Sequence, residues 1–194
     1  LQIIIYLVII LALAKPLGSY MVRVFQGAKT FLHPVLGPVE RLIYRLGGVK
    51  TDGEMNWKEY ALALMLFNVL GIFVVYALQR LQTWLPLNPM KFGPVTTDQA
   101  FNTAVSFATN TNWQSYGGET TMSYLTQMLG LAVHNFLSAA TGMAILVAMI
   151  RGFVRHSAKT LGNFWVDMTR SVLYILLPLS IILAVVLVSQ GVVQ

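Results

Sequence analysis

The chain contains no cysteine, which excludes a disulfide framework, a thiolate metal site and a cysteine nucleophile. Charge is also scarce: Asp, Glu, Lys and Arg make up 10% of the 194 residues, against roughly 25% in average soluble proteins. Four stretches carry none of these residues at all: 1–14, 60–78, 125–150 and 172–188. A soluble surface needs charge spread along the chain, so the sequence argues against a soluble enzyme.

What fills these stretches is apolar, and apolar residues make up 56% of the chain. A helix needs about 20 mostly apolar residues to cross a bilayer. We therefore predict an all-α integral membrane fold with spans near residues 3–17, 57–81, 121–150 and 166–189. A signal peptide cleaved after Ala14 is the alternative for the first stretch. No basic residue precedes that stretch, so we favour a membrane helix.

The connection over residues 19–57 is polar to amphipathic. Within it, Val39, Leu42, Ile43 and Leu46 recur at helical spacing, which predicts a short helix lying in the membrane interface. The formal charge of +6 fits this setting better than nucleic acid, because the basic residues flank the apolar runs and form no basic–aromatic cluster.

A second short helix is predicted over residues 96–108, between the second and third spans. At 1.5 Å per residue it reaches only about 20 Å and cannot cross a bilayer. Thr96 with Gln99, like Thr51 with Glu54 before the second span, matches the capping-box pattern of a helix start. The predicted arrangement is span, short re-entrant helix, polar segment, span.

The polar segment at residues 109–114 is the candidate binding site. Neutral Thr, Asn and Gln oxygens, with backbone carbonyls, can replace the hydration shell of a monovalent cation, and the absence of an acid argues against a divalent one. Glu119 lies a few residues further on, where its field would concentrate cations at an outer mouth. An ordinary polar loop between two helices remains the alternative on pattern alone.

Orientation follows from the basic residues. Residues 15–58 hold seven Lys or Arg, whereas residues 80–120 hold only Arg80 and Lys91. The positive-inside rule makes the first connection cytoplasmic, together with the one after the third span. The N-terminus and the pore loop would then face the outside.

Several motifs carry a resemblance to one family. They are Asn102–Tyr116 (NTAVSFATNTNWQSY), Gly118–Thr121 (GETT), Glu54–Trp57 (EMNW), Leu85–Pro89 (LPLNP), Asn135–Ala140 (NFLSAA), and the Leu161–Asn163 and Trp165–Asp167 pair. Together they resemble KdpA, the potassium-binding subunit family of the Kdp potassium-transporting ATPase, over essentially the whole chain.

The resemblance implies a member of the potassium-transporter superfamily, in which four span–pore–span repeats surround one selectivity filter. The chain would divide into a first extra membrane helix (1–24), a cytoplasmic connection with the interfacial helix (25–57), the first repeat (58–150, with pore helix 96–108 and filter 109–114), a cytoplasmic loop (151–164) and the first span of the second repeat (165–190). The implied potassium-binding residues are Thr109, Asn110, Thr111, Asn112 and Gln114. Unlike the glycine-centred filter of potassium channels, this segment contains no glycine.

The implied function is the potassium-binding and selectivity subunit of an ATP-driven, high-affinity importer in a bacterial or archaeal cell membrane. K⁺ is its cargo. A separate catalytic P-type ATPase subunit would hydrolyse ATP, and small accessory membrane subunits and lipid would be further partners. We expect no nucleotide site, because no Gly-x-x-x-x-Gly-Lys-Ser/Thr pattern occurs, and no nucleic-acid partner. The alternative is a channel assembled as a homotetramer.

Four further expectations concern polar residues and one tryptophan in or near the spans. His134 and Asn135 either hold the pore helix or form a helix–helix bond. Ser138 and Gly142 read as close helix packing without a functional role. Trp113 is expected to pack behind the filter. Asp167 and Arg170, at helical spacing, are expected to form a local ion pair.

Overall fold

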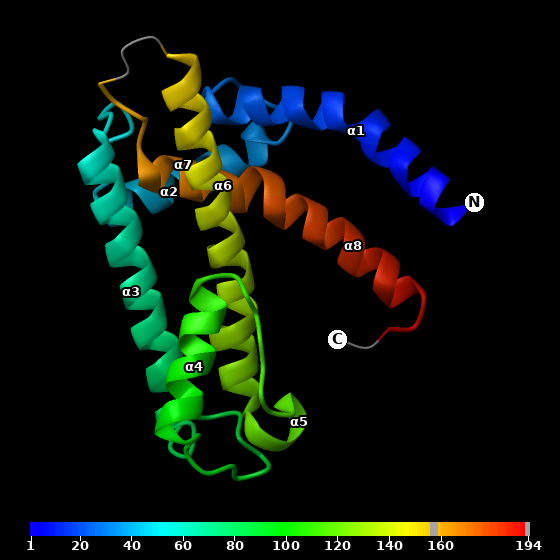
Figure 1. Ribbon diagram of the computed structural model, residues 1–194, viewed down its shortest axis with the longest axis vertical. Helices are drawn as coiled ribbons and strands as arrows, with labels where there is room; N and C mark the ends of the chain where they lie inside the picture. Colours follow the sequence, from blue (N-terminus) through cyan, green and yellow to red (C-terminus); the bar gives the residue numbers. More distant parts are fainter. Residues whose placement is uncertain (156–158, 193–194) are drawn as a thin grey trace. The chain divides into compact units, whose positions relative to one another are not determined.

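The computed structural model describes residues 1–155 and 159–192. Its elements, in order, are α1 (Gln2–Phe25), α2 (His33–Gly47), α3 (Trp57–Leu81), α4 (Thr97–Ala108), α5 (Gly118–Thr121), the π-helical segment η1 (Thr126–Ala132), α6 (Val133–Val154), α7 (Phe164–Arg170), the π-helical segment η2 (Ser171–Leu176) and α8 (Leu177–Ser189) (Figure 1). Over these described residues the extended structure is a single bridge between Met55 and Gly162. The predicted all-helical fold is confirmed.

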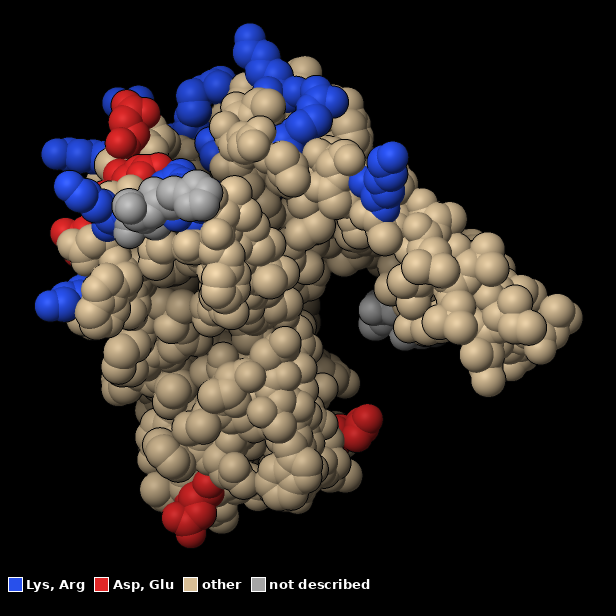
Figure 2. All heavy atoms as spheres, turned by 45° about the horizontal axis from the view of Figure 1, so that its top comes forward, with Lys and Arg blue, Asp and Glu red and all other residues tan. Residues whose placement is uncertain are grey.

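Four helices are long and apolar enough to cross a membrane: Gln2–Phe25, Trp57–Leu81, Thr126–Val154 and Phe164–Ser189. They coincide with the predicted spans, although the third begins about five residues later than expected. Wide areas of the surface carry neither acidic nor basic side chains, as the tan regions of Figure 2 show. Leu66 and Phe73 of α3 are among many large apolar side chains left exposed, which suits helices whose solvent is lipid.

The chain forms two compact units. Unit 1 contains residues 1–51 and 169–194, and unit 2 contains residues 52–168. The predicted loop 151–164 belongs to unit 2, and its residues 156–158, including His156, lie outside the described residues. Each unit is described by itself below.

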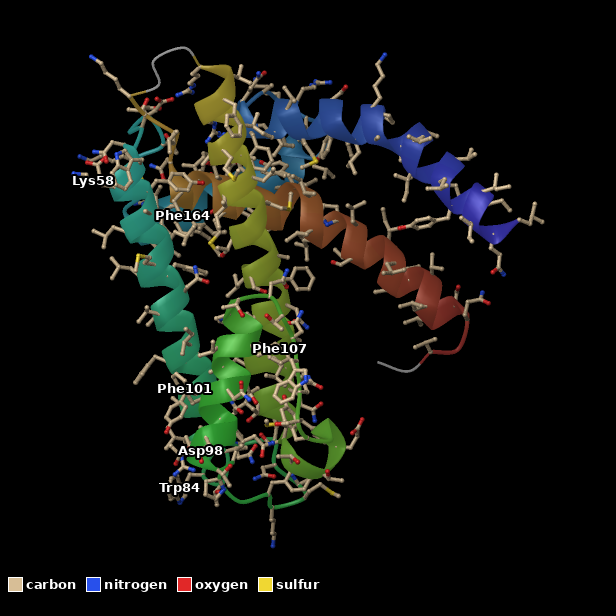
Figure 3. All side chains as sticks on the ribbon, viewed as in Figure 1. Lys58, Trp84, Asp98, Phe101, Phe107 and Phe164 are labelled. Carbon is tan, nitrogen blue, oxygen red and sulfur yellow. The ribbon has the colours of Figure 1, made fainter. Side chains whose placement is uncertain are left out.

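In unit 2, α3 and α6 run in opposite directions and α4 packs against both (Figure 1). The ion pair between Glu54 and Arg155 joins one end of the two long helices, and Gln82 binds Ser123 at the other. Figure 3 shows these two ends, with Lys58 and Phe164 at one end of the unit and Trp84 and Asp98 at the opposite end. The small residues Ala100 and Ala104 let α4 approach the long helices closely.

The core of unit 2 surrounds this short helix. Its fully or nearly fully buried members are Val75, Val95, Ala100, Ala104, Phe107, Met122 and Leu131. Where lipid is the solvent, close van der Waals packing of side chains such as that of Phe107 holds helices together. Apolar contact therefore fixes α4, and with it the start of the polar segment at residue 109.

A buried ion pair closes the other end of unit 2. Arg151 of α6 donates to both carboxylate oxygens of Asp167 at 2.5 and 2.8 Å, and the Asp167 side chain is 1% exposed. The Tyr60 hydroxyl of α3 also donates to Asp167, at 3.1 Å. Gly162 has φ of +100° and lies directly against the Arg151 guanidinium, so a side chain at this position would collide with the pair. Three helices meet at one carboxylate.

Replacing Asp167 by Asn is expected to destabilise the full-length subunit by about 3–5 kcal/mol, because it leaves the Arg151 guanidinium in a largely buried place without its counter-charge. Thermal unfolding of the purified complex in detergent measures this effect. The double variant R151M/D167L removes both charges and should recover most of the loss. A double variant as unstable as the single one would contradict a role based on charge pairing.

Two predicted helix starts differ from the structure. The capping box before α3 is formed by Asn56 and Glu59, not by Thr51 and Glu54: the Asn56 side chain accepts from the Glu59 amide, and Glu59 accepts from the Asn56 amide. Glu54 instead binds Arg155, whose hydrogen bond holds the Glu54 pKa below its ordinary value. Thr96 is the N-cap of α4 as expected, but its side chain makes no capping bond, so the predicted pairing with Gln99 is wrong.

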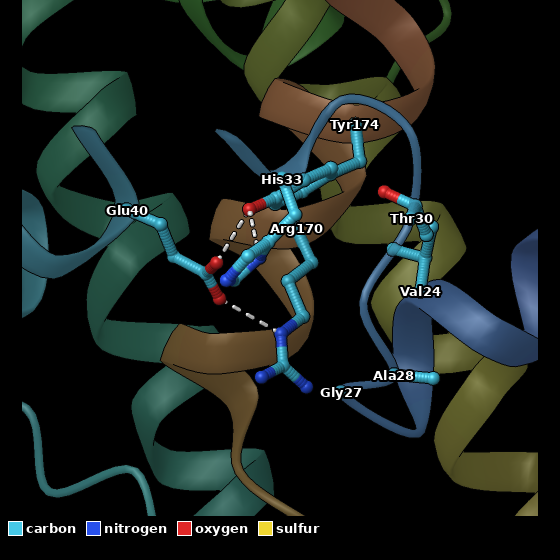
Figure 4. Close-up of a pocket in the computed structure, with 8 residues that line it drawn as sticks. All are labelled: Val24, Gly27, Ala28, Thr30, His33, Glu40, Arg170 and Tyr174. Atoms are coloured by element: carbon cyan, nitrogen blue, oxygen red, sulfur yellow. Dashed lines mark hydrogen bonds and ion pairs between the residues drawn. The ribbon is translucent and has the colours of Figure 1, made fainter. Parts of the chain in front are cut away.

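In unit 1, a buried carboxylate ties α2 to η2. Glu40 accepts hydrogen bonds from Arg170 Nε at 2.9 Å and from Tyr174 at 2.7 Å (Figure 4). It also accepts one from the Tyr44 hydroxyl at 2.8 Å. The Tyr20 hydroxyl of α1 donates to the Tyr174 carbonyl at 2.9 Å. Burial by itself raises the pKa of Glu40, but these three hydrogen bonds outweigh it and hold the pKa below its ordinary value.

The ion pair predicted between Asp167 and Arg170 is therefore wrong. Asp167 pairs with Arg151, and Arg170 pairs with Glu40. The prediction was made because the two opposite charges are one helical turn apart. Asp167 belongs to unit 2 and Arg170 to unit 1, and each binds a side chain that is distant in sequence. The predicted interfacial helix is confirmed as a helix, α2, with its membrane position still a prediction.

Candidate ion-filter loop

The candidate site begins where α4 ends. Its 12 residues make α4 about 18 Å long, too short to cross a bilayer. Thr109 follows directly as the C-cap, with φ of −86° and ψ of 5°. The negative end of the helix dipole is therefore directed at the loop, which favours a cation there.

Backbone amides of the loop turn back toward the last turn of α4. Thr111 and Asn112 donate to the Ser106 carbonyl at 2.9 and 3.2 Å, and Asn110 donates to the Phe107 carbonyl at 3.3 Å. The Trp113 amide donates to the Ser106 hydroxyl at 2.6 Å, and that hydroxyl donates to the Trp113 carbonyl at 3.1 Å. The end of the helix thus satisfies every loop amide from residue 110 to residue 113.

The backbone carbonyls of the loop, unlike its amides, remain open. Within residues 1–155 and 159–192, no group donates a hydrogen bond to the carbonyl oxygens of residues 109–112. All four residues are exposed. A loop whose amides are bound and whose carbonyls are open presents a row of negative partial charges, which is the chemistry that replaces a cation's hydration shell.

Two asparagines give the loop this form. Asn110 and Asn112 have φ of 60° and 56°, in the left-handed region. Thr109, which precedes them, and Thr111, which lies between them, have negative φ. In an extended strand, successive groups point to opposite faces. The alternating sign of φ takes the loop out of that extended form. Asn tolerates the left-handed region better than other residues with a Cβ, which explains how the segment does without glycine.

Side-chain oxygens of the same four residues lie close to one another. The Thr109 and Thr111 hydroxyls lie 3.2 Å apart, and Asn112 Nδ2 donates to Asn110 Oδ1 at 3.4 Å. Asn110 Oδ1 also accepts from the Ser138 hydroxyl of α6 at 3.2 Å. The third span therefore contacts the loop directly, through a residue that the sequence analysis had assigned to packing alone.

The remaining predicted site residues lie beyond the bound amides. Gln114 is exposed immediately after Trp113, and Glu119 is exposed in the short helix α5. Trp113 is 55% exposed, so the expectation that it packs behind the loop is wrong. Its backbone is held by the two hydrogen bonds to Ser106. Tyr116 is half-buried against the core, and burial raises the pKa of its phenol.

The loop's flanks are fixed by a residue that the sequence analysis missed. Gln82, at the end of α3, is fully buried. Its Nε2 donates to the carbonyls of Gly93 at 2.6 Å and Thr121 at 2.9 Å. Its Oε1 accepts from the Ser123 amide at 3.0 Å and the Thr126 hydroxyl at 3.4 Å. One side chain thus joins the segment that enters α4 to the segment that leaves the loop.

His134 packs against the second span. It is buried, and a Cβ placed on Gly71 of α3 would lie 2.6 Å from its ring, so this close approach requires glycine. The helix–helix interpretation of His134 is thereby favoured. Among the described residues, no three His, Asp or Glu side chains are grouped as metal ligands.

Four helices that are long and apolar enough to cross a membrane, with a short helix packed against the second and third of them, define a multi-pass membrane protein. A family model described as the potassium-transporting ATPase A subunit, KdpA, matches residues 4–194. The chain belongs to that family.

Curated relatives carry the name of the same family. The potassium-transporting ATPase potassium-binding subunit of Ralstonia pickettii is 68% identical over 194 residues, covering 100% of this chain and 33% of that protein. Proteins of the same name from Sorangium cellulosum and Methylococcus capsulatus are 64% and 63% identical, over 97% and 100% of this chain and 33% and 32% of their own lengths. The chain spans about a third of the length of these relatives.

Proposed function

We propose that this chain supplies one part of the potassium-binding site of an ATP-driven potassium importer, through a re-entrant filter loop at residues 109–114. The observation that carries the proposal is the row of open carbonyls at residues 109–112, set beside amides that are all bound to α4. Neutral oxygens in a row suit a monovalent cation such as K⁺. The names of the relatives, all potassium-binding subunits, support the choice of ion.

Gln114 and Glu119 complete the proposed entrance. Gln114 lies just past the row and would influence the affinity for K⁺, and Glu119 would raise the local cation concentration. The pore loop and the N-terminus would face the outside of a bacterial or archaeal cell membrane. The two connections that are richest in Lys and Arg would then lie in the cytoplasm, as the positive-inside rule requires.

ATP hydrolysis is assigned to a separate P-type subunit. The relatives are named as subunits of an ATPase, and small accessory membrane subunits would complete the complex. This chain would select the ion without hydrolysing ATP.

A homotetrameric channel is the less favoured reading. A single loop cannot close a ring of oxygens, so four loops must come from one long chain or from four copies. The relatives are about three times as long as this chain, which favours one long chain. Their names place them in an ATPase and not among channels.

Replacing Gln114 by Arg tests the proposed function. A guanidinium beside the carbonyl row repels K⁺, so potassium uptake by the full-length complex at low external potassium should need at least about tenfold more K⁺, which corresponds to roughly 1.4 kcal/mol. Because Gln114 is exposed, the fold should be unaffected.

Gln114→Asn is the matched control, since it keeps a neutral amide, and its uptake should stay close to that of the parent. Unchanged uptake in Gln114→Arg would show that the loop takes no part in binding the ion and would favour a purely structural role.

A further inference from the structure

The net charge of the chain lies entirely in unit 1. That unit contains seven Lys or Arg and a single acid, Glu40, which gives +6. Unit 2 contains six basic and six acidic residues and is neutral. Glu40 is buried and bound to Arg170, whereas Arg41 and Arg45 of α2 are exposed and form no ion pair with the described residues.

Helix α2 has three distinct faces. At 100° per residue, Gly37, Glu40 and Tyr44 share the buried face that docks on η2. The opposite face is apolar and exposed, and a basic edge formed by Arg41 and Arg45 lies between the two. The exposed apolar residues are Val35, Val39, Leu42, Ile43 and Leu46, with exposed fractions from 39% for Ile43 to 78% for Leu46. We call these five residues, with Arg41 and Arg45, the α2 outer face.

The contacts of α2 support an interfacial position. Glu40 binds Arg170 and Tyr174, which lie at the start of the charge-free stretch 172–188 that crosses the bilayer. Tyr174 is in turn bound by Tyr20, in the last turns of α1. Helix α2 is thereby bound beside the last turns of α1 and the start of η2, where these two helices are expected to reach the polar region of the bilayer.

We propose that the α2 outer face lies on the membrane, with its apolar stripe among the acyl chains and with Arg41 and Arg45 binding the phosphate groups of anionic phospholipids. An exposed apolar stripe beside a basic edge, at interfacial depth, is the pattern of helices that lie in the plane of the membrane. The two exposed arginines, Arg41 and Arg45, favour anionic over zwitterionic lipid. This surface is separate from the loop at residues 109–114 and does not depend on the function proposed for it.

A fluorescent probe on the outer face reports what covers it. The full-length complex carrying Leu42→Cys labelled with bimane is reconstituted into phosphatidylcholine vesicles and into vesicles with 30% phosphatidylglycerol. Brominated forms of either lipid quench the probe when they contact it. Labelling of the parent chain gives the background.

We expect quenching by both lipids, with brominated phosphatidylglycerol favoured. Two arginines near an anionic surface should favour phosphatidylglycerol over phosphatidylcholine by up to roughly thirtyfold at low salt. This preference should fall as salt is added, because salt screens the attraction. In R41Q/R45Q the preference should fall close to one while quenching persists. Lys91→Gln, in unit 2, should leave the preference unchanged.

Two results would overturn the proposal. Absence of quenching by either lipid would mean that protein covers this face, whether another part of the subunit or a partner. Equal quenching by the two lipids in the parent would leave a membrane-facing helix without any selection for anionic lipid.

Discussion

Substituting Asn112 by Val is expected to raise the potassium concentration needed for half-maximal uptake by roughly five- to 150-fold. The residue has φ of 56°, and holding a β-branched side chain in the left-handed region costs about 1–3 kcal/mol. Valine would pull the backbone out of that region and turn a carbonyl away from the row. The potassium dependence of ATP hydrolysis by the full-length complex measures the change.

Asn112→Gly separates backbone from side chain. Glycine adopts positive φ without steric cost, so the carbonyl row should survive and the potassium affinity should stay much closer to that of the parent. If glycine is as damaging as valine, the asparagine amide itself binds the ion and the backbone account is wrong. Asn110 is less suitable for this comparison, because its side chain also binds Ser138.

The second large effect is expected at Gln82. Replacing it by Leu keeps the approximate volume but leaves the carbonyls of Gly93 and Thr121 and the amide of Ser123 without their partner. Of these groups the Ser123 amide belongs to a buried residue, and an orphaned buried group costs about 1–3 kcal/mol. We expect a lower melting temperature together with weaker potassium binding, because both flanks of the loop lose their common anchor.

Thr83→Ala provides the matched control for Gln82. Thr83 is the next residue in the chain, is exposed, and makes only a long 3.4 Å hydrogen bond to Phe92. Its substitution should change neither stability nor potassium dependence. Weaker binding in Gln82→Leu without any loss of stability would point to direct contact with the ion path, and full activity would refute the anchoring role.

Local sequence predicted the elements well, because length and hydropathy are local properties. The charge-free stretches located all four spans, and the distance from residue 96 to residue 108 showed that one helix was too short to cross. Polar residues after it marked the loop at residues 109–114. Local patterns failed where a partner lies far away: Glu54 was assigned to a cap and binds Arg155, and Asp167 was paired with Arg170 but binds Arg151.

The amino-acid sequence alone therefore determined that this is a four-span membrane chain with a polar loop after a short helix, since apolar length and the lack of charge leave no other solvent than lipid. Only the tertiary structure decided how the loop presents its atoms. These features are the left-handed φ of Asn110 and Asn112, the amides turned onto Ser106 and the anchor at Gln82, and the bonds of that anchor join residues up to 44 positions apart. No local pattern encodes such contacts, because they form only when α3, α4 and α6 pack together.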